Sequence, residues 1–104
     1  MSAAYQLLRE ALQNRQSCYA IYDGYVRYFC PHVIGWKQGT EQVLCWQYAG
    51  DSSRPLPPQG QWKCFTISKI GGLVTTDQRW RDGEPGHMGK PTSCVDRVDL
   101  EIQI

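Results

Sequence analysis

The dipeptide Asp23-Gly24 is the sequence feature that most constrains how this chain folds. It joins two segments, 17–22 and 25–30, that are rich in aromatic and β-branched residues. A two-residue Asp-Gly connection suits a type I′ turn, because both residues tolerate positive φ and the twist of this turn matches that of paired strands. The sequence therefore predicts an antiparallel hairpin, whose second strand ends at Pro31 because proline has no N–H for a ladder hydrogen bond.

More segments with strand composition follow this hairpin. The further predicted strands cover residues 42–48, 62–70, 73–76 and 96–104. The last of them alternates apolar and polar residues strictly, which is typical of a half-buried strand. Residues 50–60 form a loop stiffened by three prolines, and the Gly-, Pro- and charge-rich stretch 77–94 is expected to be an irregular excursion.

The N-terminus has the pattern of an amphipathic helix over residues 3–15. Ser2 is a suitable N-cap, and apolar residues then recur at three- and four-residue spacing. One helix followed by short antiparallel strands with tight turns predicts a mainly β fold, a small SH3- or Sm-like antiparallel barrel with an N-terminal α-helix. A chain of 104 residues has room for one such domain.

The net charge of +1 argues against a large basic surface for nucleic acid. The charge is nevertheless uneven: residues 25–69 carry five basic and two acidic side chains, whereas residues 70–104 carry four basic and six acidic ones. The middle of the chain, at five minus two or +3, is therefore the part that would attract a small anion or a short single strand.

Cysteine usage and the N-terminus both bear on location. The five cysteines are odd in number and include no Cys-x-x-Cys pair, so we expect reduced core residues in a cytoplasmic protein. Residues 1–15 lack the continuous apolar core of a signal peptide, and no run is long enough to span a membrane.

Neither the Cys30-Pro31-His32 pair nor His87 with Cys94 matches a zinc spacing, so no metal or other cofactor is expected. Cysteine catalysis is not expected either, and the chain is interpreted as a non-enzyme.

An ordered set of residues along the chain resembles the WYL-domain superfamily, and in particular its short stand-alone members. The residues that carry the resemblance are Tyr22, Asp23, Gly24, Arg27, Pro31, His32, Gly35, Gln47, Tyr48, Gly50, Ser52, Ser53, Trp62, Lys63, Phe65, Lys69 and Ile70. The exact Trp-Tyr-Leu run is missing from the matching strand around Trp46, and Lys69 stands where the family often has Arg.

The resemblance implies a single WYL-like domain over residues 1–104 with an Sm-like barrel. WYL domains are bacterial ligand-sensing or regulatory modules, commonly attached to a DNA-binding helix-turn-helix, and some are implicated in binding nucleic-acid fragments or nucleotides. No such DNA-binding module is expected in this chain. Lys69 has no planar fork for gripping phosphate or carboxylate, so an arginine-dependent mode of ligand binding is not implied at that position.

The sequence and the resemblance together select one candidate ligand site. Its residues are Arg27, His32, Trp46, Tyr48, Lys63 and Lys69. For His32 we favour a structural role, a backbone hydrogen bond at the end of the strand. Trp46 and Tyr48, with Tyr22 and Trp62, form either a stacking platform for a flat ligand or part of the core.

Two other readings stay open. Ser52, Ser53 and Arg54 suit either an anion cradle or ordinary turn capping, and we favour capping.

The function expected is non-catalytic binding of a nucleotide, a short nucleic acid or another small anion. The alternative is an interaction or assembly subunit that pairs through exposed aromatic residues, such as Trp36 and Trp80, and through the C-terminal edge strand.

Overall fold

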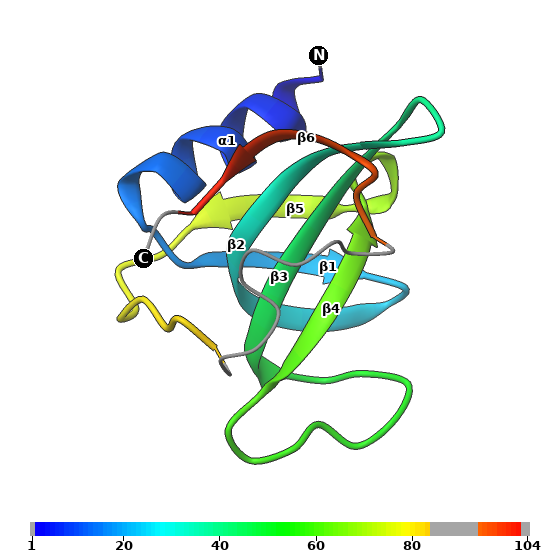
Figure 1. The fold of residues 1–104 in the computed structure, drawn as a ribbon. Helices are drawn as coiled ribbons and strands as arrows, with labels where there is room; N and C mark the ends of the chain where they lie inside the picture. Colours follow the sequence, from blue (N-terminus) through cyan, green and yellow to red (C-terminus); the bar gives the residue numbers. More distant parts are fainter. Residues whose placement is uncertain (1, 84–93, 103–104) are drawn as a thin grey trace.

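The computed structural model describes residues 2–83 and 94–102, which form a mainly β fold with one N-terminal helix (Figure 1). The elements are α1 (Ala3–Asn14), β1 (Cys18–Tyr22), β2 (Tyr25–Lys37), β3 (Thr40–Gly50), β4 (Gln61–Thr66), the 3-10 helix η1 (Ile67–Lys69), β5 (Gly71–Thr75) and β6 (Arg97–Glu101). All strand pairs are antiparallel, in the order β4-β3-β2-β1-β5, with β6 paired to β2.

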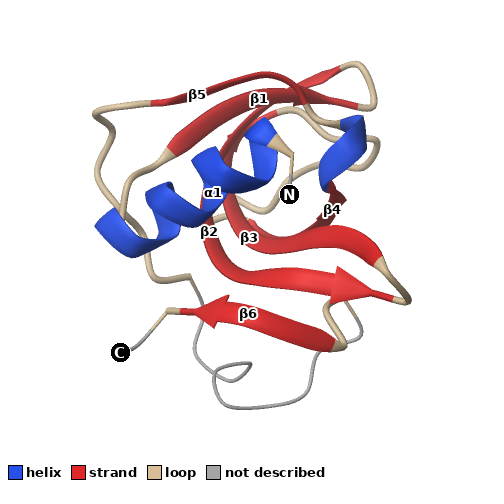
Figure 2. Ribbon diagram, turned by 90° about the horizontal axis from the view of Figure 1, so that it is seen from above, coloured by secondary structure: helices blue, strands red, loops and turns tan. Residues whose placement is uncertain are grey.

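The sheet is strongly curved but open. Seen from above, β2 and β3 bend around α1 (Figure 2). Strands β1 and β5 lie on one side of the helix, and β6 lies on the other side. Within the described residues no pairing joins the two ends of the sheet, so the expected antiparallel, helix-bearing β fold is confirmed without closure into a barrel. The same residues contain no helix of the length and apolarity that crossing a membrane requires.

The predicted Asp23-Gly24 turn is confirmed. Both residues have positive φ, 53° and 77°, as a type I′ turn requires, and Tyr22 pairs directly with Tyr25. The hairpin between β2 and β3 has a turn of the same kind, in which Gln38 and Gly39 both have positive φ.

Pro31 does not end the second strand as predicted, because β2 continues through it to Lys37. The pairing with β3 shifts register between Pro31 and Val33, which makes His32 the extra residue of a β-bulge. On the other edge of β2, β1 pairs as far as Phe29 and β6 begins at Val33. Pro31 lies in the gap between these two partners, where the missing N–H leaves no ladder bond unmade.

The main core lies between α1 and the concave side of the sheet, which we call the inner face. The helix is capped as predicted, since Ser2 Oγ accepts from the backbone N of Tyr5 at 3.1 Å. The core side chains, all buried, are Tyr5, Leu8, Ala11, Leu12, Cys18, Ala20, Phe29, Ile34, Val43, Cys45, Phe65, Ile67 and Ile102. Burying this apolar surface is the main contribution that holds the helix on the sheet.

A second, smaller cluster lies on the opposite side of β2, β3 and β4, which we call the outer face. Val33 and Leu44 of the sheet pack there against Cys94 and Val95. Cys94 forms a disulfide with Cys64 of β4, which corrects the expectation of five reduced cysteines. Sequence gave no sign of the pair because their 30-residue separation matches no motif, and only the fold brings them together. The other three cysteines are free and buried.

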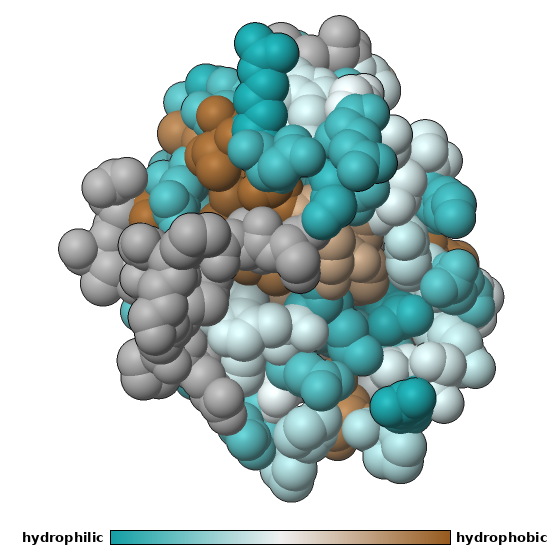
Figure 3. Space-filling model, turned by 45° about the vertical axis from the view of Figure 1, so that its right-hand side comes forward, coloured by the Kyte–Doolittle hydropathy of each residue, from teal (hydrophilic) through white to brown (hydrophobic). Residues whose placement is uncertain are grey.

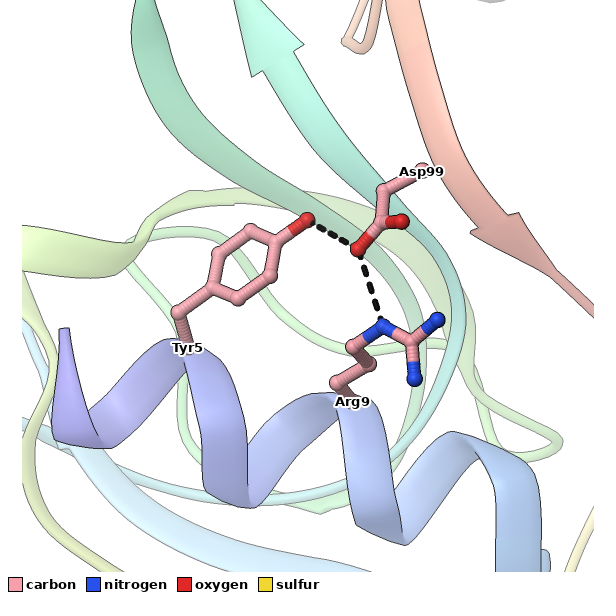
Figure 4. A network of polar contacts seen from close by, with 3 residues as sticks. All are labelled: Tyr5, Arg9 and Asp99. Carbon is pink, nitrogen blue, oxygen red and sulfur yellow. Dashed lines mark hydrogen bonds and ion pairs between the residues drawn. The ribbon is translucent and has the colours of Figure 1, made fainter. Parts of the chain in front are cut away.

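The C-terminal strand is confirmed over Arg97–Glu101, and the end of its predicted range, 103–104, lies outside the described residues. Its strict alternation is interrupted, because the register with β2 shifts around Asp99. Asp99 therefore turns towards α1, where its Oδ2 accepts from Tyr5 Oη at 2.6 Å and from Arg9 Nε at 3.0 Å (Figure 4). This network ties the last strand to the first helix.

Candidate functional site

Aromatic side chains cover the outer face where β2, β3 and β4 lie side by side. Trp46 and Trp62 are paired in register, and their rings meet edge to face with centroids 5.0 Å apart. The His32 ring lies 5.0 Å from that of Trp62, and Trp80 stacks on His32, also at 5.0 Å. These rings form one aromatic cluster, in which Trp62 packs against the outer-face cluster and Trp80 also reaches the main core.

Trp80 is held in place from two directions. The buried His32 beneath it is fixed by a hydrogen bond from its Nδ1 to the carbonyl oxygen of Cys30, at 2.8 Å. The indole Nε1 of Trp80 donates to Oδ1 of Asp82 at 3.0 Å. The ring is therefore oriented within the chain itself, which lowers the entropy lost when a ligand stacks on it.

A hollow of about 560 Å³ lies beside this cluster. It is lined by Trp46, Tyr48, Pro58, Gln59, Arg79, Trp80, Arg81, Asp82 and Gly83. This volume falls within the roughly 300–1,000 Å³ typical of small-molecule sites. Two arginines and one aspartate in the lining leave it a net charge of one positive unit.

Arg81 fastens the segment after β5 to the sheet. Its backbone N donates to Sγ of Cys30 at 3.4 Å, and its guanidinium lies 3.7 Å from the centroid of the Tyr48 ring. Its Nη1 also donates to the carbonyl of Arg79 at 2.8 Å. A guanidinium has five N–H donors, so this one bond leaves it well able to bind an anion above Tyr48.

On the face drawn in Figure 3, hydrophobic surface is broken into limited patches, with the largest beside the grey residues. Hydrophilic residues occupy most of the rest of that view. Over residues 2–83 and 94–102, the exposed large apolar side chains are Ile21, Val74 and Val98. They lie on β1, β5 and β6, away from the residues that line the hollow.

Three of the predicted site residues lie together on the outer face. Trp46 and Tyr48 line the hollow, and His32 supports Trp80 with the backbone bond that we favoured for it. Trp46 combines the two roles considered for it, core packing and lining of a ligand site: it is only 3% exposed, and it forms a wall of the hollow. Tyr22 does not join this platform, because its ring packs on Phe65 of the inner face at 4.4 Å.

The other three predicted residues are elsewhere. Arg27 is buried on the inner face, where its Nη1 donates to Oε1 of Gln47 at 3.0 Å. Lys63 lies on the same face and donates to Oγ of Ser52 at 3.0 Å. Lys69 is exposed at the end of η1, near α1. The structure therefore does not bring Arg27, His32 and Lys69 of the candidate site together, because the sheet separates the first two and Lys69 lies at the end of the 3-10 turn.

The sequence did not select Arg79 and Arg81. The sequence predicts that Trp80 is an exposed contact residue and that its segment, 77–94, is an irregular excursion. The signal available was the alternation Arg79-Trp80-Arg81, a basic residue on each side of an aromatic one. The position of this segment beside the hollow depends on the hydrogen bond from the backbone N of Arg81 to Cys30, which is far away in the chain, so the sequence alone does not reveal it.

The described residues include no group of three or more His, Cys, Asp or Glu side chains placed to hold a metal ion, and His87 lies outside them. Burial raises the pKa of the Cys18 thiol to about 12 and that of Cys30 to about 11. A raised pKa removes the thiolate that nucleophilic chemistry needs.

No protein-family model, curated protein or solved structure matches this chain.

Proposed function

We propose that this chain is a non-catalytic binding module whose ligand is a flat, negatively charged molecule such as a nucleotide or a short single strand. The outer-face hollow is its site. The observation that carries the proposal is a pre-oriented Trp80 flanked in sequence by two arginines that line the same hollow. Stacking a base on an aromatic ring contributes roughly 1–3 kcal/mol, and arginine is suited to phosphate oxygens.

A non-catalytic role is supported by the state of the nucleophiles. The three free thiols are buried, and burial raises the pKa of each. His32 uses Nδ1 for a backbone bond, and its ring stacks on Trp80 and meets the ring of Trp62 edge to face. Such groups serve better as structural supports than as acid, base or nucleophile.

The WYL-like assignment and the Sm-like barrel form part of this proposal. They are supported by the antiparallel order, the helix and the curvature of the sheet. We propose that the chain is an open variant of that barrel. A cytoplasmic location has less support than the sequence suggested, because the Cys64–Cys94 disulfide is typical of oxidising compartments.

Calorimetric titration with AMP, adenosine and ribose 5-phosphate tests the function. We expect AMP to bind more tightly than either fragment, because only AMP has both the base and the phosphate. Trp80→Leu should weaken AMP and adenosine, whereas Arg79→Gln should weaken AMP and ribose 5-phosphate. Trp36→Leu and Lys69→Gln are matched controls, since both positions lie outside the hollow. Equal affinities for all variants, or no binding of AMP or an oligothymidylate at millimolar concentration, would refute the proposal.

A second candidate function is assembly through β6. This strand pairs with β2 along one edge, and the described residues place no strand on its other edge. Val98 on it is 50% exposed. A free edge with an exposed apolar residue is suited to pairing with another chain. Light scattering after size exclusion should then show a dimer that Val98→Lys converts to a monomer, and a monomeric wild type would exclude this candidate.

A further inference from the structure

Arg27 is a buried cation whose bonding partners are neutral. Its side chain is 4% exposed, and its Nε and Nη2 donate to the carbonyl oxygen of Tyr22 at 3.3 and 3.2 Å. Nη1 donates to the side-chain oxygen of Gln47, and the guanidinium lies 5.4 Å from the ring centroid of Phe65. Among the described residues no carboxylate pairs with Arg27, and the ion pair of Arg9 with Asp99 lies elsewhere, between α1 and β6. A buried positive charge whose hydrogen-bond partners are all neutral is stabilised when an anion binds nearby.

Lys63 lies within electrostatic reach of both Arg27 and Arg54, at the end of the inner face where β3 leads into its loop. Lys63 shares that face, because it follows the alternation of β4 from the core residue Phe65. The pKa of Lys63 is lowered, first by burial and then by the positive charges of Arg27 and Arg54. Lys63 therefore lies in the positive potential of two neighbouring guanidinium groups.

Ser52 is the centre of the polar contacts in this region. Its Oγ accepts from Nζ of Lys63 at 3.0 Å and from the backbone N of Arg54 at 3.4 Å. With both acceptor positions used, the hydroxyl hydrogen is the part of Ser52 that can meet an incoming group. A hydroxyl, an ammonium and a guanidinium are the donors that proteins direct at phosphate oxygens.

We propose that Ser52, Arg54 and Lys63 form a binding site for a phosphate group, with the buried charge of Arg27 behind it. The site is separate from the outer-face hollow, because Lys63 lies on the opposite face of the sheet from Trp46 and Trp62. A phosphate dianion offsets more of the positive charge than a carboxylate or a chloride does. The serine-arginine turn then acts as an anion cradle, the reading that sequence alone did not favour.

An NMR titration of the whole chain with sodium phosphate, against sodium chloride at equal ionic strength, tests this site. We expect saturable shifts at the backbone amides of Ser52 and Arg54 with phosphate only. Lys63→Gln should weaken phosphate binding roughly tenfold, because a charge-assisted contact is lost. Lys69→Gln removes the same charge from an exposed position and should leave the affinity unchanged.

A second readout uses the unaltered chain. Bound phosphate should raise the pKa of Lys63, followed through its side-chain carbon resonance. Shifts that do not saturate, equal effects of the two lysine variants, or an unmoved Lys63 titration would each overturn the proposal.

Comparing inorganic phosphate with AMP distinguishes a free anion from a phosphate ester. Tighter binding of AMP at the Ser52 amide assigns the site to esters, and equal or weaker binding assigns it to the free anion. Arg79→Gln separates this proposal from that for the hollow. The substitution should weaken AMP at the hollow without changing the phosphate shifts at Ser52.

Discussion

The Tyr5–Asp99 hydrogen bond determines how firmly β6 is held to α1. Tyr5 is fully buried, and its hydroxyl donates to a charged carboxylate oxygen at 2.6 Å (Figure 4). Hydrogen bonds to charged groups contribute about 1.5–3 kcal/mol. The Asp99 side chain is 22% exposed, so water takes over part of the lost bond, and we expect Tyr5→Phe to lower the free energy of unfolding by about 1–2 kcal/mol.

Arg9 provides an internal comparison. Its bond to the same carboxylate is 3.0 Å long, but the two side chains are 31% and 22% exposed. Exposed ion pairs contribute about 0.2–1 kcal/mol, so Arg9→Gln should be the milder change. Urea unfolding of Tyr5→Phe, Asp99→Asn and the double variant measures the coupling directly. A coupling energy below about 0.3 kcal/mol, or a larger effect from Arg9→Gln than from Tyr5→Phe, would refute the reasoning.

The same network predicts a pH dependence with a definite sign. The Tyr5 hydrogen bond, and then Arg9, lower the pKa of Asp99 below its ordinary 3.8. The folded state therefore binds this proton less readily than the unfolded chain does, so the contribution is complete above pH 3.8 and is lost as the pH falls through the lowered value. Tyr5→Phe should reduce this loss in acid more than Arg9→Gln does, because the tyrosine bond is the larger cause.

Three further predictions concern the framework. Reducing the disulfide between Cys64 and Cys94, which are 30 residues apart, should lower the free energy of unfolding by about 3–4 kcal/mol, measured in urea with and without phosphine. The free thiols should resist iodoacetamide at pH 8 until the chain unfolds, because burial raises the pKa of Cys18, for example, to about 12; rapid labelling of the native protein would contradict this. Gly35→Ala should speed amide exchange in β6, because a Cβ there collides with the carbonyl of Arg97, and unchanged exchange would show that β6 does not rely on this close approach.

Local signals in the sequence predicted local structure well. Asp23-Gly24 specified its turn because the φ preferences of two residues suffice for that, and Ser2 specified the start of α1 in the same way. The prediction that the strand ends at Pro31 was wrong, because a proline interrupts a strand only where a neighbouring strand needs its N–H. Sequence could not show that β1 stops and β6 starts on either side of it.

The candidate site was predictable only in part. Trp46 and Tyr48 were placed on one face by strand alternation, which is a local property. Arg81 reaches the hollow through its contacts with Cys30 and Tyr48, and these long-range contacts leave no periodic signal in the sequence. The separation of Lys69 from Lys63 also escaped prediction, because a strand expected to run through 62–70 ends at Thr66 and continues as a 3-10 turn.

The bulge at His32 gives the two halves of β2 different folding histories. The first half pairs with β1 across a two-residue turn, a contact that a hairpin forms within microseconds. The second half pairs with β6, where Val33 meets Glu101, so loop closure over most of the chain must come first. The meander from β1 to β4 should therefore assemble before β6 docks. Amide protons of β6 should exchange through a local opening while those of the β1–β2 hairpin stay protected.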